Sequence, residues 1–167
     1  VTAFMSAAVK AAAFVAFLRV FIVGLDGAYA TWYPLMWWLA AVTMVAANLM
    51  ALVQSNVKRM LAYSSVAHAG YLLVAITASN QAAAAGLLFY LLIYAAMNIG
   101  TFACILCMRR GGRIVKCIYD LAGLRNTHPM IALALATFMF SMAGIPPLAG
   151  FFGKLYIFQA AIAVEFY

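Results

Sequence analysis

Two lysines and one histidine occur inside long apolar runs, where an ionisable side chain is costly. Lys10 lies in SAAVKAAAF, Lys154 lies in GFFGKLY, and His68 lies in the middle of LAYSSVAHAGYLLVAITAS. A lysine at the centre of a bilayer costs about 3 kcal/mol on insertion scales. A buried amine can lose and regain a proton near neutral pH, whereas a guanidinium cannot. These residue types therefore favour proton transfer through an apolar interior.

Hydroxyl and amide side chains accompany the three ionisable groups. One helix face, with steps of four, four and three, would hold Tyr90, Tyr94, Asn98 and Thr101. Ser64 and Ser65 precede His68 by about one turn. We expect a relay of lysine, hydroxyls, histidine and lysine that is linked by water. Three alternatives remain open: a lysine paired with a carboxylate of another chain, a histidine that only packs, and a polar face that only joins helices.

The segments that carry these residues are too apolar for a water-soluble protein. Of the 167 residues 69% are hydrophobic and 8% are charged, and the mean hydropathy is +1.08. A soluble domain is closer to half apolar and a quarter charged. We predict an all-α polytopic membrane helix bundle, a single transmembrane domain over residues 1–167 with about five spans. The predicted spans are about 2–24, 34–53, 61–79, 82–108 and 130–165.

The last apolar run has about 36 residues and contains FSMAGIPPLAGFFGKLYIF. It would measure roughly 54 Å as a helix, too long for one straight span and short for two. Prolines remove backbone donors and clash with the preceding turn. We predict one discontinuous helix whose break involves Gly144, Pro146, Pro147 and Gly150. Such breaks mark ion and substrate sites in transporters. The alternative is a tight loop between two short helices that do not span.

The basic residues behind the net charge of +7 gather in the linkers, and this is not the pattern of a nucleic-acid-binding surface. Linkers 54–60 and 109–129 hold seven basic residues, and the opposite linkers hold Asp26 and no basic residue. The positive-inside rule then predicts that both basic linkers lie on the cytoplasmic or matrix side.

Metal and redox chemistry have little support in the sequence. Cys104 and Cys107 lie one helical turn apart in an apolar run without a nearby histidine, which makes a poor zinc site. The chain shows no Rossmann glycine pattern, no P-loop and no cysteine cluster for iron–sulfur ligation. We therefore expect no cofactor and no metal in this chain.

Three segments resemble a known family: AAVKAAAFVAFLRVF (8–22), NVKRMLAYSSVAHAGYLLVAI (56–76) and SMAGIPPLAGFFGKLYIF (141–158). They resemble the antiporter-like subunit N family of proton-pumping NADH–quinone oxidoreductase, respiratory complex I. The mitochondrial equivalent is subunit two of the NADH dehydrogenase. The resemblance covers essentially all of this chain but only part of the family's length. The family's first half, and the part that would follow Tyr167, have no counterpart here.

The resemblance implies a role for each ionisable residue. Lys10 matches the lysine of the eighth family helix, a central member of the hydrophilic axis. Lys154 matches the lysine of the broken twelfth helix, in the output half-channel, and His68 matches a polar position on the tenth helix between them. The implied activity is a translocase that moves protons while quinone is reduced elsewhere in the complex.

The resemblance also implies the setting of the chain. Flavin, iron–sulfur clusters and quinone are expected in partner subunits of complex I, and the chain itself contacts lipid and no nucleic acid. We expect a bacterial inner (plasma) membrane, with the mitochondrial inner membrane as the alternative. Two rival functions stay open. One is a subunit of a related multisubunit cation/proton antiporter or membrane-bound hydrogenase, and the other is a structural membrane scaffold without an ion path.

Overall fold

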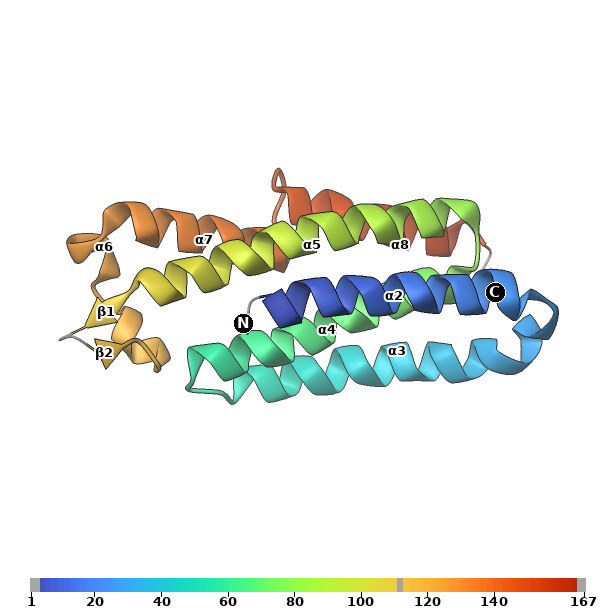
Figure 1. Ribbon diagram of the computed structural model, residues 1–167, viewed down its shortest axis with the longest axis horizontal. Helices are drawn as coiled ribbons and strands as arrows, with labels where there is room; N and C mark the ends of the chain where they lie inside the picture. Colours follow the sequence, from blue (N-terminus) through green and yellow to red (C-terminus); the bar gives the residue numbers. More distant parts are fainter. Residues whose placement is uncertain (1–3, 111–112, 165–167) are drawn as a thin grey trace.

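The computed structural model describes residues 4–110 and 113–164, which form a bundle of helices along one long axis (Figure 1). The first span consists of a π-helix η1 (Met5–Val9), the α-helix α2 (Lys10–Leu18) and a second π-helix η2 (Arg19–Gly24). After a short turn, η3 (Asp26–Ala28), come α3 (Tyr29–Leu52), α4 (Val57–Ala78) and α5 (Gln81–Cys107). These four segments are long and apolar enough to cross a membrane.

Helix α3 begins five residues before the predicted span at 34. Pro34 therefore lies inside the helix rather than in its first turn. Two hydrogen bonds hold this earlier start. Tyr29 Oη donates to the Thr77 carbonyl of α4 at 2.9 Å, and Trp32 Nε1 donates to the Leu25 carbonyl of the preceding turn at 3.0 Å. The predicted ends at 2 and 165 lie outside the described residues.

The basic linker after α5 folds into short elements. It contains the antiparallel strands β1 (Arg109–Arg110) and β2 (Arg113–Ile114), a 3₁₀ turn η4 (Ile118–Leu121) and the helix α6 (Leu124–Thr127). This linker pairs with the α3–α4 linker. Val57 N–H donates to the Lys116 carbonyl at 3.0 Å, and Ile118 N–H donates to the Ser55 carbonyl at 2.9 Å. The two basic linkers therefore lie at the same end of the bundle.

The last apolar run is a broken helix, as predicted. Helix α7 (Pro129–Ala143) ends at Gly144, whose φ is +90°, and α8 (Ala149–Ile162) begins after a turn that contains the cis peptide Pro146–Pro147. Phe138 of α7 packs beside Gly100 near the end of α5, whereas Tyr156 of α8 packs beside Gly86 near its start. The two halves therefore lie end to end along α5 (Figure 1). The halves have 15 and 14 residues, so neither alone has the length of a span.

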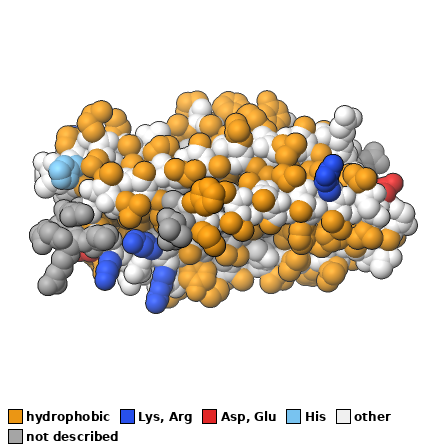
Figure 2. Space-filling model, in the orientation of Figure 1, with side chains coloured by type: hydrophobic (Ala, Val, Ile, Leu, Met, Phe, Trp, Pro, Cys, Tyr) orange, Lys and Arg blue, Asp and Glu red, His pale blue; other side chains and the backbone are white. Residues whose placement is uncertain are grey.

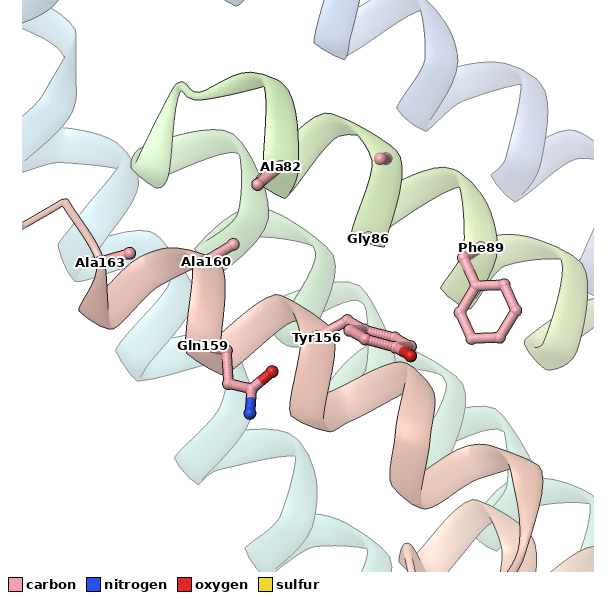
Figure 3. A pocket seen from close by; sticks show the side chains of 8 residues that line it. Ala82, Gly86, Phe89, Tyr156, Gln159, Ala160 and Ala163 are labelled. Carbon is pink, nitrogen blue, oxygen red and sulfur yellow. The ribbon is translucent and has the colours of Figure 1, made fainter.

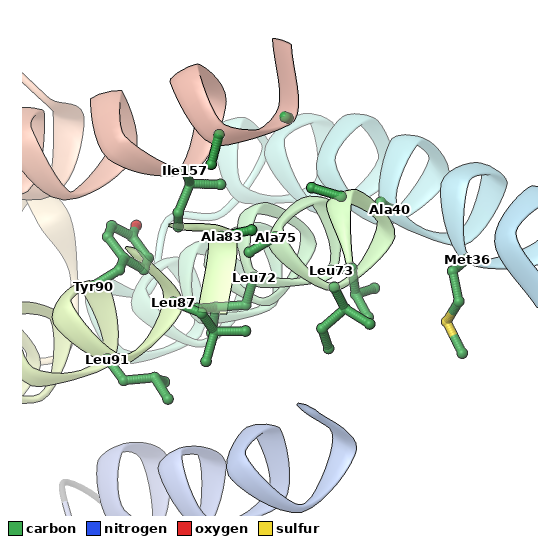
Figure 4. Close-up of a cluster of buried hydrophobic side chains, with 14 of the residues drawn as sticks. Met36, Ala40, Leu72, Leu73, Ala75, Ala83, Leu87, Tyr90, Leu91 and Ile157 are labelled. Carbon is green, nitrogen blue, oxygen red and sulfur yellow. The ribbon is translucent and has the colours of Figure 1, made fainter. Parts of the chain in front are cut away.

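A buried cluster holds α3, α4, α5 and α8 together (Figure 4). Leu72 and Ile76 of α4, Leu87 of α5 and Ile157 of α8 are fully buried there. The outside of the bundle is largely apolar, and Figure 2 shows lysine and arginine side chains gathered mainly near the end that carries β1 and β2. A surface of this kind suits lipid along the sides and water at the basic end.

Candidate functional site

Lys10 is the first residue of α2 and reaches both α4 and α5. Its ammonium Nζ donates to the Ser65 carbonyl, to Ser65 Oγ at 2.7 Å and to the Tyr94 hydroxyl at 3.4 Å. The same Nζ lies 4.6 Å from the centre of the Tyr94 ring, a cation–π distance. Lys10 is thus held by two neighbouring helices. The π-helix that ends directly before Lys10 has no counterpart in the hydropathy pattern, and π-helical turns are frequent at functional sites.

His68 lies in the middle of α4 and is 4% exposed. Its Nδ1 shares a hydrogen bond with the Tyr90 hydroxyl of α5. The centre of the imidazole ring lies 5.2 Å from the centre of the Tyr94 ring. Because Tyr94 also contacts Lys10, the tyrosine connects the surroundings of the lysine to those of the histidine.

Lys154 lies on α8, and its ammonium crosses the helix break. Nζ donates to the carbonyls of Met142 at 2.8 Å and Ala143 at 3.2 Å, in the last turn of α7. The last carbonyls of a helix have no partner inside it and carry partial negative charge. The break therefore gives the lysine oxygen acceptors that a continuous helix would use for its own hydrogen bonds.

Tyr71 lies between His68 and Lys154 and is not among the predicted site residues. The centre of its ring lies 4.8 Å from Lys154 Nζ and 5.7 Å from the centre of the His68 ring. Tyr71 follows His68 by three residues on α4, so it lies one turn further on the same helix face. That spacing is the signal that could have found it.

Ser64, His68, Tyr71 and Lys154 line a cavity of about 580 Å³. The cavity also reaches Gln54 and Ile118 in the linkers at the basic end. It gives water a place beside the lysine and the histidine, since polar groups line part of its wall.

The remaining residues of the predicted polar face are buried in α5. Asn98 is 2% exposed and Thr101 is fully buried, both on the basic side of Tyr94. The Thr101 hydroxyl donates to the Met97 carbonyl of its own helix at 2.8 Å. Because this bond stays within α5, the Thr101 hydroxyl proton is not available for transfer to a neighbouring helix.

Gly150 lies in the first turn of α8 rather than within the break itself. A Cβ there would lie 1.8 Å from the Ser141 carbonyl oxygen, and Gly150 N–H donates to Ser141 Oγ at 3.1 Å. Gly150 thus permits the close approach of the two half-helices. Gly144, by contrast, supplies the left-handed backbone that ends α7.

Within the described ranges, no carboxylate accompanies the two lysines. The acids there are Asp26 and Asp120, and both lie in linkers. In the same part of the chain no group of three or more His, Cys, Asp or Glu could hold a metal ion. The arrangement can hold and pass protons, because its polar groups are amines, hydroxyls and an imidazole.

A second groove, between α5 and α8, has a different character (Figure 3). It measures about 490 Å³ and is lined mainly by small and aromatic side chains, among them Gly86, Phe89 and Tyr156. Gln159 is its one polar amide side chain. No ionisable amine, imidazole or carboxylate lines it, so the groove is not continuous in character with the polar residues around Lys10, His68 and Lys154.

The whole chain, residues 1–167, matches the family described as "NADH:quinone oxidoreductase/Mrp antiporter, TM". It is 51% identical over 162 residues to NADH-quinone oxidoreductase subunit N of Granulibacter bethesdensis, which covers 97% of this chain and 34% of that protein. It is 51% identical over 163 residues to the subunit N of Rhodospirillum rubrum, with coverage of 97% and 33%. The chain thus spans about a third of the length of the curated relatives it matches.

A solved structure shares the fold. A chain of respiratory complex I from Thermus thermophilus with bound aureothin aligns with a TM-score of 0.68 and 39% sequence identity. The alignment covers 79% of this chain and 30% of that one.

Proposed function

The chain belongs to the transmembrane family of NADH:quinone oxidoreductases and Mrp antiporters, and on that premise we propose that it translocates protons as part of a subunit N of NADH–quinone oxidoreductase. The protons move through Lys10, His68 and Lys154 while quinone is reduced in other subunits. Hydroxyls of Ser65, Tyr90 and Tyr94 support the transfer, with water between them.

One observation carries the proposal. The ammonium groups of Lys10 and Lys154 both lie over tyrosine rings, and both of those rings flank the buried His68. A bundle that served only to hold other subunits would gain nothing from two amines in an apolar interior that have no carboxylate partner among the described residues. A proton carrier gains from them, because a lysine freed of close acids can release its proton.

The names of the relatives indicate the partners and the membrane of this chain. Proteins about half identical to this chain carry the name subunit N, so the partners are other membrane and peripheral subunits of complex I. Flavin, iron–sulfur clusters and quinone belong to those partners. The relatives are bacterial, which favours the bacterial plasma membrane, with the basic linkers on its cytoplasmic side.

An Mrp-type cation/proton antiporter is the second candidate, because the family description names both classes. The names of the relatives favour the oxidoreductase. Co-purification of the full-length protein distinguishes the two: flavin and iron–sulfur subunits are expected with it, and their absence together with cation-dependent proton exchange would favour the antiporter.

Substitution of Lys154 tests the mechanism. In the intact complex, Lys154→Ala should reduce quinone-linked proton pumping at least about tenfold, since the carrier is gone. Lys154→Arg should fail as well, because arginine keeps the charge but does not release the proton. Pumping is measured in membrane vesicles, beside NADH oxidation by an artificial acceptor, which should stay at the native rate.

The matched control is Lys58→Ala, which removes a lysine from the basic linker end and should leave pumping near native. Native pumping by Lys154→Arg would mean that the residue is a fixed charge, and the relay would be wrong at this position.

A further inference from the structure

We propose that Tyr71 is a positioning residue for Lys154, whose aromatic face stabilises the charged ammonium in place of a carboxylate counter-ion. The inference rests on the proposed function, since it concerns how the same lysine is held. Tyr71 would keep the protonated lysine on the carbonyls at the end of α7, ready to release its proton.

The contacts of Lys154 show why its charged ammonium requires further stabilisation. Its ammonium has three donors, and carbonyls of Met142 and Ala143 accept from it. Carbonyl dipoles solvate a cation but do not neutralise it. The face of the Tyr71 ring, 4.8 Å from Nζ, supplies further negative potential. The ring is itself fixed, because its centre lies 6.0 Å from that of Phe158 in an edge-to-face contact.

Lys10 also lies over a tyrosine ring, and its Nζ donates to the hydroxyl of that tyrosine as well, at 3.4 Å. Its Nζ lies 4.6 Å from the centre of the Tyr94 ring. Each lysine therefore has a tyrosine face, and each of these tyrosines lies beside His68. The pattern thus occurs twice in the bundle, with rings supplied by two different helices, α4 and α5.

The ionisable groups around Lys154 decide what removal of the ring would do. His68 and Tyr71 of α4 line the same cavity as Lys154, and Tyr90 of α5 packs beside Gly153, one residue before the lysine. Lys10 of α2 lies beyond them. No acid among the described residues joins this group, because Asp26 and Asp120 are in linkers. Without the ring the charged form of Lys154 loses support, and no acid among the described residues replaces it.

The test measures the pH profile of quinone-linked pumping by the intact complex in vesicles. Tyr71→Leu should move the alkaline limb of the profile to lower pH by about half a unit to one and a half units. Tyr71→Phe and Tyr71→Trp keep an aromatic face and should retain the native limb. A series of phenylalanines with one, two and three ring fluorines at position 71 keeps the shape but weakens the ring's negative face, so the limb should move stepwise.

Tyr63→Leu is the matched control, because Tyr63 is a half-buried tyrosine on the same helix, whereas the rings beside the two lysines are those of Tyr94 and Tyr71. Its profile should be native. A fluorine series without a trend, or a Tyr71→Phe variant that shifts as far as Tyr71→Leu, would overturn the inference. Lys154→Ala is run in parallel: if it abolishes pumping while the Tyr71 series is flat, the proposed function stands and the role of Tyr71 falls.

Discussion

At the scale of single residues, Ser65 is the main anchor of Lys10. Both its carbonyl and its hydroxyl accept from the lysine ammonium, and the Tyr94 hydroxyl donates to the same Oγ at 2.9 Å. A hydrogen bond to a charged group contributes about 1.5–3 kcal/mol. The hydroxyl can therefore be separated experimentally from the carbonyl, which any residue at position 65 would keep.

Ser65→Ala should slow quinone-linked pumping by about three- to tenfold. The carbonyl and the Tyr94 ring still hold Lys10, so the loss is smaller than for removal of a lysine. Thr137→Ala is the control, because the exposed Thr137 hydroxyl bonds only within α7, to the Leu133 carbonyl at 2.9 Å. Equal pumping by Ser65→Ala and native complex would exclude a role for this hydroxyl.

The ionisable residues were predictable from the sequence because a charge in an apolar run is conspicuous. Lys10, Lys154 and His68 stood out in this way, and the structure brings each beside tyrosines. Tyr71 was missed because a tyrosine in such a run is ordinary, and its meaning depends on Lys154, which is distant in the chain. Only the packing of α8 on α4 reveals that contact.

At the scale of elements, the break between α7 and α8 depends on a close backbone contact. Gly150→Ala would place a Cβ 1.8 Å from the Ser141 carbonyl oxygen, which belongs to the backbone and cannot rotate away. The half-helices would have to separate. Overpacking of this kind costs about 1–3 kcal/mol, and sometimes more.

Gly150→Ala should therefore lower the thermal stability of the complex and reduce pumping, although Lys154 is unchanged. Gly86→Ala is the control, since its Cβ would meet its nearest atom at an ordinary 3.5 Å. Thermal unfolding and pumping are measured for both variants. If Gly150→Ala behaved like Gly86→Ala, the close approach of α7 and α8 would not matter to function.

Hydropathy identified the spans but not their local form. The break followed from two prolines and from the length of the run. The π-helices η1 and η2 could not be predicted from the sequence, because an apolar stretch has the same composition whether its turns are α or π. The start of α3 before Pro34 was not predicted either, because it depends in part on a hydrogen bond from Tyr29 to the distant Thr77 carbonyl.

At the scale of the whole molecule, the bundle has one basic end and one end without lysine or arginine in its turns. The α3–α4 linker and the linker after α5 are joined at the basic end by the backbone bridge between Asn56 and Cys117. The α4–α5 turn, with Ser79 and Asn80, lies at the other end of α4 and α5. The charge asymmetry predicts which end faces the cytoplasm.

Thiol labelling tests this orientation with a cysteine that the chain already has. Cys117 is exposed in the basic linker, and Gln81 is exposed at the start of α5, at the opposite end. With Cys104 and Cys107 replaced by alanine, a membrane-impermeant maleimide should label Cys117 only in inside-out vesicles, which expose the cytoplasmic face. In a variant that also carries Cys117→Ala and Gln81→Cys, only right-side-out vesicles should react. Because α5 is the one long helix between Gln81 and Cys117 along the chain, labelling of both positions from one face would refute its crossing and with it the five-span bundle.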